Sequence, residues 1–327
     1  MTDGPLRATF AAPTPSLVTL AGGVGAAKLL TGLIRVHSPS DQLAVVNTAD
    51  DTVLHGLHVS PDLDTVVYTL AGAVNPDTGW GLAGETWQAM DALDRYGGIT
   101  WFRLGDRDLA THLYRTHRMD QGADLAAVTA EIAAAWGLEL AVLPVTNDRI
   151  ETRVTTVDEG EIGFQDYFVR RRHDVSVTAV RVDGAMAAQP APGLIEALAA
   201  ARSIIIAPSN PIVSIGPVLG VPGVREAVAA RREAVVAVSP IVGGAALKGP
   251  ADRLMRELGH ECSVVGVARL YQDVAATLVI DEADSHLADD VEAAGVACVV
   301  APTVMDGVES AAELARTILK CTGVTRA

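Results

Sequence analysis

A single stretch near the N-terminus most narrows the folds open to this chain. The apolar run Leu17–Ala21 breaks into the glycine-rich turn Gly22–Gly25, and a helical pattern starts directly afterwards at Ala26. This order predicts a buried strand, a tight turn and the N-terminus of a helix. Glycine permits positive φ and lets an anion approach the backbone closely. A helix N-terminus adds free N–H groups and a positive dipole end, so the stretch predicts a phosphate-binding site.

The spacing of these glycines does not identify the phosphate ligand. A dinucleotide fingerprint needs G-x-G-x-x-G or a final alanine, whereas the run from Gly23 ends in Lys28. The Walker pattern G-x-x-x-x-G-K-[ST] is absent as well. A tight strand-to-helix turn without a ligand is the alternative. It explains less well why two glycines are followed so closely by Lys28 in the first turn of the predicted helix.

The overall charge limits the partners that the chain can have. The 327 residues carry a formal net charge of −15, which argues against a nucleic-acid binder because phosphate neutralisation requires clustered Lys and Arg. An anionic ligand must then be held locally, and metal ions among carboxylates would supply the missing positive charge. Hydrophobic residues make up 49% of the chain and charged residues 20%, which is typical of a folded globular protein.

Further features concern the compartment and the N-terminus. Cys262, Cys298 and Cys321 do not have the spacing of a zinc site or a CxxC pair, which indicates reduced thiols and a cytoplasmic protein. Residues 1–15 are rich in proline and contain no sustained apolar segment, so we expect a flexible leader rather than a signal peptide. No stretch of the sequence is long and apolar enough to predict a membrane span.

Four aspartates follow a second predicted strand. The apolar run Leu43–Asn47 predicts a buried parallel strand that leads into Asp50 and Asp51, with Asp62 and Asp64 shortly afterwards. Because the carboxyl ends of parallel strands face one crevice, these acids should lie beside the glycine turn. They could hold magnesium, which prefers few carboxylates together with phosphate oxygens and water. Each acid taken alone could instead cap a helix or lie in a solvated loop, and Asp64 fits a helix cap equally well.

Aromatic and imidazole side chains near these acids are further candidates. A glycine-rich loop over residues 75–87 carries Trp80 and Trp87 in a chain with only 4% aromatic residues. Trp80 could stack on a flat ligand, whereas Trp87, at the start of a predicted helix, fits a structural plug better. His55 and His58 are more typical of structural or surface histidines than of metal ligands, although His55 could donate to a phosphate.

The rest of the pattern predicts an α/β fold with a doubly wound, mostly parallel, Rossmann-like sheet. Helical patterns alternate with apolar runs at 203–208, 234–239, 276–280 and 296–300. Residues 16–327 should form one domain, with an inserted mixed α/β segment at about 60–185. Half-exposed antiparallel strands are expected at 151–157 and 176–182 of this insertion. The Arg170–Arg172 run between them could meet an anion or a partner subunit, but such a run is more often a solvated rim.

Two more strand ends carry small polar residues and glycines. They are Ser209–Gly216 and Ser239–Gly249, and such positions are where a nucleotide or diphosphate lies in this kind of sheet. Together with the glycine turn and the acids, they predict a magnesium–diphosphate site at one edge of the sheet. A carboxylate there could accept a hydroxyl proton during group transfer.

The order of these motifs resembles that of the CofD/FbiA family over about residues 16–322. The matching segments are Leu20–Gly25, Asn47–Asp51, Ser60–Thr65, Gly79–Gly81, Ala207–Pro211, Ser214–Pro217 and Ser239–Gly244. Each segment alone is a weak signal, but the ordered set is specific. Many members of the family carry glycine at the position of Ala49, so the local turn differs here.

The resemblance implies a transferase in the biosynthesis of an 8-hydroxy-5-deazaflavin coenzyme. Members of the family take a guanosine-diphosphate-activated three-carbon acid, of the phosphoenolpyruvate or 2-phospho-L-lactate type, and the deazaflavin precursor Fo. The terminal ribityl hydroxyl of Fo attacks the phosphorus, GMP leaves, and a phosphodiester forms. The resemblance also implies a magnesium requirement, binding of the GDP moiety, a Rossmann-like fold with an insertion and a homodimer.

Matching positions carry the implied roles over to this chain. Asp50 is expected to be the catalytic base or a metal ligand, with Asp51, Asp62 and Asp64 as further metal ligands. The nucleotide and its phosphates are expected to contact Gly22, Gly23, Gly25, Lys28, His55, Ser209, Asn210, Ser214, Gly216, Ser239 and Gly243. The deazaflavin is expected to contact Thr65, Trp80, Gly81 and Glu85.

A related branch suggests a function of a different class. Its members share the glycine loop and the NxxDD segment but are nucleotide-sugar-binding regulators of cell-wall growth without clear catalysis. The segments Gly79–Gly81 and Pro61–Asp64 favour the transferase. A nucleotide-sugar transferase would be supported only if deazaflavin failed to bind.

Overall fold

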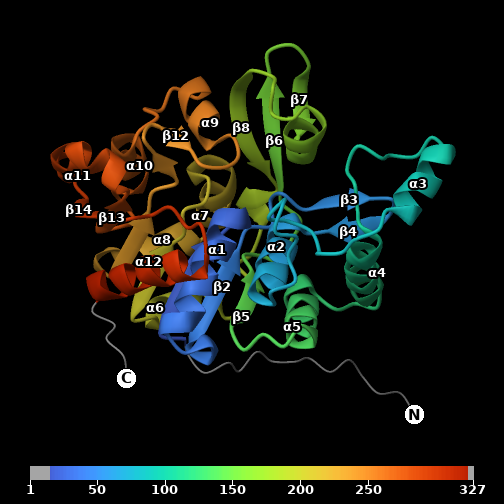
Figure 1. The fold of residues 1–327 in the computed structure, drawn as a ribbon, viewed down its shortest axis with the longest axis horizontal. Coiled ribbons are helices and arrows are strands. Elements are labelled where there is room, and N and C mark those ends of the chain that lie inside the picture. Colours follow the sequence, from blue (N-terminus) through green and yellow to red (C-terminus); the bar gives the residue numbers. More distant parts are fainter. Residues whose placement is uncertain (1–14, 323–327) are drawn as a thin grey trace.

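Seven parallel strands form the central sheet, in the order β14-β13-β10-β9-β1-β2-β5 (Figure 1). The computed structural model describes residues 15–322, so all but the last residue of the predicted leader lies outside it. The strands are β1 (Leu17–Ala21), β2 (Gln42–Val46), β5 (Ala141–Pro144), β9 (Ser203–Ile206), β10 (Val235–Val238), β13 (Thr277–Ile280) and β14 (Ala297–Val300). From β1 the chain adds strands first on one side and then on the other. The topological switch point therefore lies between β1 and β9.

Helices cover both faces of this sheet, which confirms the predicted doubly wound α/β architecture. One face packs against α1, α2, α5 and α12, and the other against α6, α7, α8, α10 and α11. The helices are α1 (Gly23–Val36), α2 (Pro61–Leu70), α3 (Gln88–Arg95), α4 (Asp106–Asp120), α5 (Leu125–Ala135), α6 (Leu194–Ala200), α7 (Gly216–Gly220), α8 (Val224–Ala229), α9 (Ala251–Glu257), α10 (Val264–Tyr271), α11 (Ala288–Ala293) and α12 (Val308–Cys321). Short 3₁₀ and π turns span Pro39–Asp41, Asp166–Arg170, Ala185–Ala187, Pro211–Ile215, Arg232–Ala234 and Glu282–Leu287.

The double covering explains why the strands appear in the sequence as continuous apolar runs. Every residue of β1 is buried, because both of its faces meet helices and neither meets solvent. The same covering hides α10 from sequence analysis, which does not predict it. Six of its eight residues are buried, and its short apolar run Val264–Val267 does not distinguish a helix from a buried strand in the local sequence. The one local signal is Ser263, which caps α10 by accepting from the N–H groups of Val265 and Gly266.

The range predicted as an insertion, 60–185, is divided between the central fold and smaller units. Strand β5 pairs in parallel with β2 at the sheet edge, and α2 and α5 cover one face. Outside the sheet lie a hairpin of β3 (Thr52–Leu54) and β4 (Leu57–Val59), and an antiparallel sheet of β6 (Glu151–Thr156), β7 (Gly160–Gly163) and β8 (Val177–Asp183) (Figure 1). A further short pair, β11 (Ile241–Val242) and β12 (Ala245–Ala246), follows β10. Within residues 15–322, every helix is too short or too polar to cross a lipid bilayer.

The packing of α1 against α12 predicts a stability effect at Gly32. A Cβ atom at Gly32 would lie 2.1 Å from the carbonyl oxygen of Ala311. Gly32→Ala must therefore push the two helices apart, and we expect the free energy of unfolding to fall by about 1–3 kcal/mol in urea denaturation. Gly220→Ala in α7 is the control, because a Cβ there meets no described atom within 4 Å. Equal stability of the two variants would contradict the close approach of α1 and α12.

Candidate active site

The glycine turn lies at the switch point of the sheet. Helix α1 starts at Gly23, whose φ of +66° favours glycine, and Gly22 is its N-cap. A Cβ at Gly22 would lie 2.6 Å from the Cβ of Ser214, and one at Gly25 would lie 2.4 Å from the carbonyl oxygen of Pro208. The N-terminus of α1 thus touches the loop that follows β9, and these glycines are required by close approach rather than by the turn alone.

The loop after β9 uses its polar side chains in two different ways. The hydroxyl of Ser209 donates to the carbonyl of Gly22 at 2.8 Å and accepts from its N–H at 3.2 Å, so it joins the loop to the glycine turn. The side-chain oxygen of Asn210 accepts from the N–H groups of Ile212 and Val213. Within the described residues the buried Nδ2 of Asn210 has no partner. Of the two predicted phosphate contacts, Asn210 therefore has the free donor.

Asp62 connects the acids to this turn. It lies in the first turn of α2, and its Oδ2 accepts from Nδ2 of Asn47 at 3.0 Å. The N–H of Gly23, at the start of α1, also stabilises the carboxylate. Burial nevertheless raises the pKa of Asp62 to about 7, and the negative charge of Asp51 adds to the effect. Asp62 is thus a buried carboxyl group held against the N-terminus of α1.

Asp50 is the second buried acid of this group. Burial raises its pKa well above the ordinary range, and the negative charge of Asp62 raises it further. Its Oδ1 is inaccessible to solvent and has no hydrogen-bond partner among residues 15–322. A buried carboxylate without a partner is costly, and a bound cation offsets that cost. Asp50 and Asp62 therefore fit the prediction of a magnesium site.

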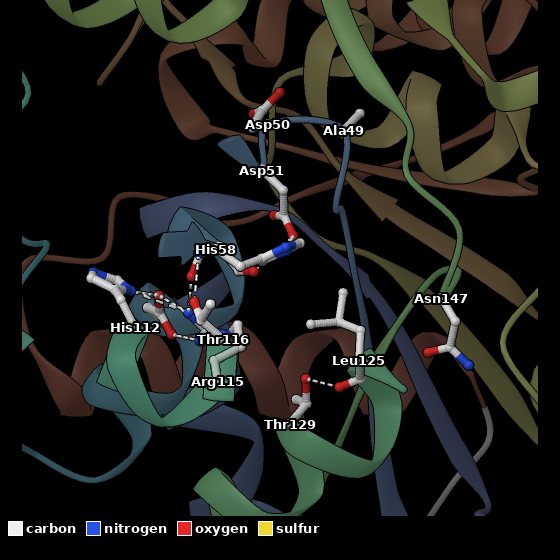
Figure 2. A network of polar contacts seen from close by, with 12 residues as sticks. Ala49, Asp50, Asp51, His58, His112, Arg115, Thr116, Leu125, Thr129 and Asn147 are labelled. Carbon is white, nitrogen blue, oxygen red and sulfur yellow. Dashed lines mark hydrogen bonds and ion pairs between the residues drawn. The ribbon is translucent and has the colours of Figure 1, made fainter. Parts of the chain in front are cut away.

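Asp51 points away from Asp50 and toward the β3–β4 hairpin (Figure 2). Its Oδ2 accepts from Nε2 of His58 at 3.0 Å and from the hydroxyl of Ser60 at 2.7 Å, while burial still raises its pKa. In the described part of the chain, Oδ1 of Asp51 has no partner. His58 lies on β4, so it supports Asp51. His55 lies exposed in the hairpin turn with a φ of +53°, which does not support its prediction as a phosphate donor.

Asp64 does not join the other acids. Both of its oxygens are engaged by the guanidinium group of the buried Arg115, at 3.2 Å for the Nη1–Oδ2 contact. The imidazole of His112 lies nearby, and one ligand atom each from Asp64, Asp108 and His112 fall within 4.8 Å of one another. Among the described residues this is the only such group, so the four predicted metal ligands do not form one cluster. Arg115 already neutralises Asp64, which makes its role structural.

Two other predicted contacts are occupied by backbone groups. The ammonium group of Lys28 lies in the second turn of α1 and donates to the carbonyl of Met305 at 2.8 Å. The carboxylate of Glu85 accepts from the N–H groups of Arg107 and Asp108, both at 2.8 Å, and so caps α4. The structure thus gives Lys28 and Glu85 a structural contact each, and their roles as phosphate and deazaflavin ligands stay predictions. Helix capping by an acid explains Glu85 fully.

The tryptophan loop reaches the start of α1. A Cβ at Gly79 would lie 3.3 Å from the side chain of Val24 and 3.1 Å from Nζ of Lys248, which also donates to the carbonyl of Thr78. Trp80 follows directly and is 50% exposed. This arrangement places Gly79 beside the start of α1 and leaves the indole ring of the next residue, Trp80, accessible. Of the other predicted deazaflavin contacts, Thr65 is buried in α2, and Gly81 has a φ of +68° that the loop requires.

The remaining predicted nucleotide contacts lie around the same edge of the sheet. Ser239 follows β10, but its hydroxyl is used within its own turn by the N–H and carbonyl of Ile241. The N–H of Gly243 donates to Asp284 at 2.8 Å. Ser214 lies against Gly22, and Gly216 starts α7. These residues shape the loops. Among the described residues, the unpartnered buried polar groups around the site belong to Thr48, Asp50, Asp51, Thr152 and Asn210.

Three further residues build the site, and only one of them has a signal in the local sequence. Asn47 accepts from the N–H of Ala49 and donates to Asp62, and Gln165 donates to the carbonyl of Asp50. Arg115 reaches Asp64 across 51 positions of the chain. An amide at the end of a buried strand marks Asn47 in the sequence, whereas Gln165 and Arg115 are brought in only by long-range folding.

Known proteins similar to this chain cover nearly its whole length. The family model described as 2-phospho-L-lactate transferase CofD matches residues 17–316. A protein named phosphoenolpyruvate transferase from Kitasatospora aureofaciens is 46% identical and covers 93% of this chain and 96% of its own. One of the same name from Streptomyces griseus is 43% identical and covers 95% and 99%. A solved structure from Bacillus halodurans matches the fold with a TM-score of 0.62 at 17% identity, over 94% of this chain and 100% of its own.

The raised pKa of Asp62 predicts a specific dependence of stability on pH. Its pKa of about 7 in the folded protein exceeds the ordinary value of 3.8. The folded state thus keeps this proton in a pH range where the unfolded state has lost it, so stability falls as pH rises from about 4 to about 7. Asp62→Asn removes this ionisation. Between pH 4 and pH 7 we expect the free energy of unfolding of the variant to rise relative to that of the wild type. The difference should reach on the order of a few kcal/mol at pH 8.

The measurement is urea denaturation between pH 5 and pH 8 without divalent metal. Asp94→Asn, at an exposed position in α3, is the control and should follow the wild type. A constant difference between Asp62→Asn and the wild type at all pH values would contradict the assignment.

The buried ion pair of Arg115 predicts a large loss of stability. Arg115→Met leaves Asp64 buried without its partner, and we expect the free energy of unfolding to fall by about 3–5 kcal/mol. Adding Asp64→Asn should recover part of this loss. Arg316→Met, which breaks exposed contacts with Glu309 and Glu313, should cost less than about 1 kcal/mol. Similar losses for Arg115→Met and Arg316→Met, in chemical denaturation, would exclude the buried pair.

Proposed function

The chain belongs to the CofD family of 2-phospho-L-lactate transferases, and from this premise we propose a specific transfer reaction. The protein moves a phospho-three-carbon-acid group from a guanosine-diphosphate-activated donor to the ribityl hydroxyl of Fo. The bond to the hydroxyl oxygen forms as the bond to the GMP phosphate breaks, so the products are a phosphodiester and GMP. Relatives at 43% and 46% identity carry the name phosphoenolpyruvate transferase, which favours phosphoenolpyruvyl over 2-phospho-L-lactyl as the group transferred.

The buried carboxyl pair at the N-terminus of α1 carries this proposal. Asp62 contacts the start of α1, and Asp50 lies close enough to be affected by its charge, with one oxygen free of described partners. A parallel sheet places its ligands at the switch point, beside a helix N-terminus suited to phosphate. The acids and the phosphate-binding helix N-terminus are therefore close together, as phosphoryl transfer requires.

The proposed roles follow from these contacts. The N–H groups at the start of α1 and Nδ2 of Asn210 bind the diphosphate of the donor. The carboxylate of Asp50 accepts the proton of the ribityl hydroxyl as the hydroxyl oxygen attacks, because a carboxyl with a raised pKa is a stronger base. Magnesium held by Asp50 and Asp62 would neutralise negative charge on the diphosphate.

The acceptor binds on the side of the tryptophan loop in this proposal. Trp80 is half exposed and directly follows Gly79, which lies beside Val24 of α1. A flat ring system can stack on its indole. Thr65 lies on helix α2, three residues after Asp62. We also propose a cytoplasmic homodimer, and this proposal is supported by the sequence pattern and the family resemblance alone.

The direct test is a transfer assay with purified protein, Fo and Mg²⁺. Guanosine-diphosphate donors carrying phosphoenolpyruvate, phospholactate or phosphoglycerate are compared, and GMP release and the phosphodiester product are measured. We expect turnover, fastest with the phosphoenolpyruvyl donor. Absence of GMP release with every donor would reject the transferase, and tight binding of a nucleotide-sugar without turnover would support the regulator.

Asp50 is the decisive residue for catalysis. Asp50→Asn keeps the size of the side chain but removes the base, so we expect kcat to fall by at least about 10²-fold with an unchanged circular dichroism spectrum. The exposed Asp94→Asn is again the control and should retain full activity. Near wild-type turnover in Asp50→Asn would remove this carboxylate from the mechanism.

A further inference from the structure

The carboxyl group of Asp50 depends on its backbone for its position, although the side chains of Thr152 and Asn47 lie near enough to lower its pKa. Its Oδ1 has no partner among residues 15–322. The side chain has only two torsions, so its position depends on the turn Thr48–Asp51. Whatever fixes this turn fixes the acid.

The turn is held both from within and from outside. Within it, the N–H of Asp51 donates to the carbonyl of Thr48 at 3.2 Å, and the N–H of Ala49 donates to the side chain of Asn47 at 2.9 Å. From outside, the N–H of Thr152 on β6 donates to the carbonyl of Ala49 at 2.7 Å. The amide of Gln165 donates to the carbonyl of Asp50 itself at 2.8 Å. Of these contacts, the one from Gln165 is made by a side chain from another part of the fold.

Gln165 is well suited to hold the turn because its own position is rigid. It is 8% exposed and lies directly before the π turn Asp166–Arg170. Its neighbours Phe164 and Tyr167 are buried in a small core with Val154 of β6 and Val213 of the loop after β9. This core connects the β6–β8 sheet to the loop after β9, and the amide of Gln165 connects the same segment to the Asp50 turn.

The Arg170–Arg172 run, which the proposed mechanism does not use, contributes to the same arrangement. Arg171 forms an ion pair with Glu159 in the turn between β6 and β7, and Arg170 lies 3.7 Å from Asp166. Phe168 stacks on Phe164 at a centroid distance of 5.5 Å and an interplanar angle of 8°. Charge and stacking thus hold the segment around Gln165 against the β6–β8 sheet.

We propose that Gln165 is a positioning residue that holds the Asp50 carbonyl and so keeps the Asp50 carboxyl aimed into the site. The catalytic consequence rests on the proposed transferase function, whereas the effect on the turn does not. Without the amide donor, the buried carbonyl of Asp50 loses its partner and the turn samples other conformations. A partner that orients a functional group in this way contributes about 10- to 100-fold. The loss should fall on kcat, because Gln165 does not contact either substrate in the proposed site.

The test compares Gln165→Met and Gln165→Glu with Gln42→Met. Gln165→Met keeps most of the volume of the side chain but removes the donor, so a packing role would tolerate it and a positioning role would not. Gln165→Glu keeps the shape of the side chain and replaces the donor with an acceptor. Gln42 is a matched control: it is a buried glutamine whose amide also donates to backbone carbonyls, those of Leu33 and His37. It lies at the opposite end of β2 from the Asp50 turn.

Two measurements separate this proposal from the proposed function. Amide hydrogen exchange of the peptide spanning residues 47–52 should be faster in both Gln165 variants and unchanged in Gln42→Met. In the transfer assay, both Gln165 variants should lose about 10- to 100-fold in kcat with little change in KM, while Gln42→Met keeps its kcat whatever its Tm. Unchanged exchange at 47–52, or equal kcat in Gln165→Glu and Gln42→Met, would overturn the proposal. If the wild type released no GMP, the exchange data would still decide the role of Gln165.

Discussion

The close contact between the glycine turn of α1 and the loop after β9 is the constraint on which the rest of the site depends. One hydroxyl, that of Ser209, joins the two by bonding both backbone groups of Gly22. The contact is possible only because Gly22 and Gly25 lack side chains. It closes the switch point between β1 and β9 and places the start of α1 beside the acids. An anion bound there meets backbone N–H groups and carboxyl groups at once.

Two buried acids at such a place would be unfavourable without a partner. Burial raises the pKa of both Asp50 and Asp62, which shows that the protein alone does not compensate their negative charge. By contrast, Asp64 is neutralised by Arg115, and Asp51 has hydrogen bonds from His58 and Ser60. The protein thus neutralises Asp64 internally and compensates Asp51 only in part, because Oδ1 of Asp51 has no partner among residues 15–322. It leaves Asp50 and Asp62 for a cation. This difference between the acids indicates that Asp50 and Asp62 lower the stability of the folded protein because the function of the site requires them.

Much of the fold could be predicted from the sequence because each strand of a parallel sheet covered on both faces is a continuous run of apolar residues. The strand ends, and therefore Gly22, Asp50 and Ser209, follow from those runs. Side-chain assignments were less predictable where another part of the chain decides the outcome. Lys28 binds the carbonyl of Met305, and Glu85 caps α4, and both partners are distant in sequence. Strand β5 falls within the range 60–185 that the sequence predicted as an insertion. Its pairing with β2 in the central sheet cannot be recognised from the local sequence.

The position of the metal and the diphosphate tests this account most directly. A crystal structure of the protein with GDP and Mn²⁺, which replaces Mg²⁺ and scatters anomalously, would locate both. The account predicts an anomalous peak in contact with Asp50 and Asp62, with the diphosphate at the N-terminus of α1. A peak at Asp64, Asp108 and His112, or a diphosphate bound away from Gly22 and Asn210, would contradict it.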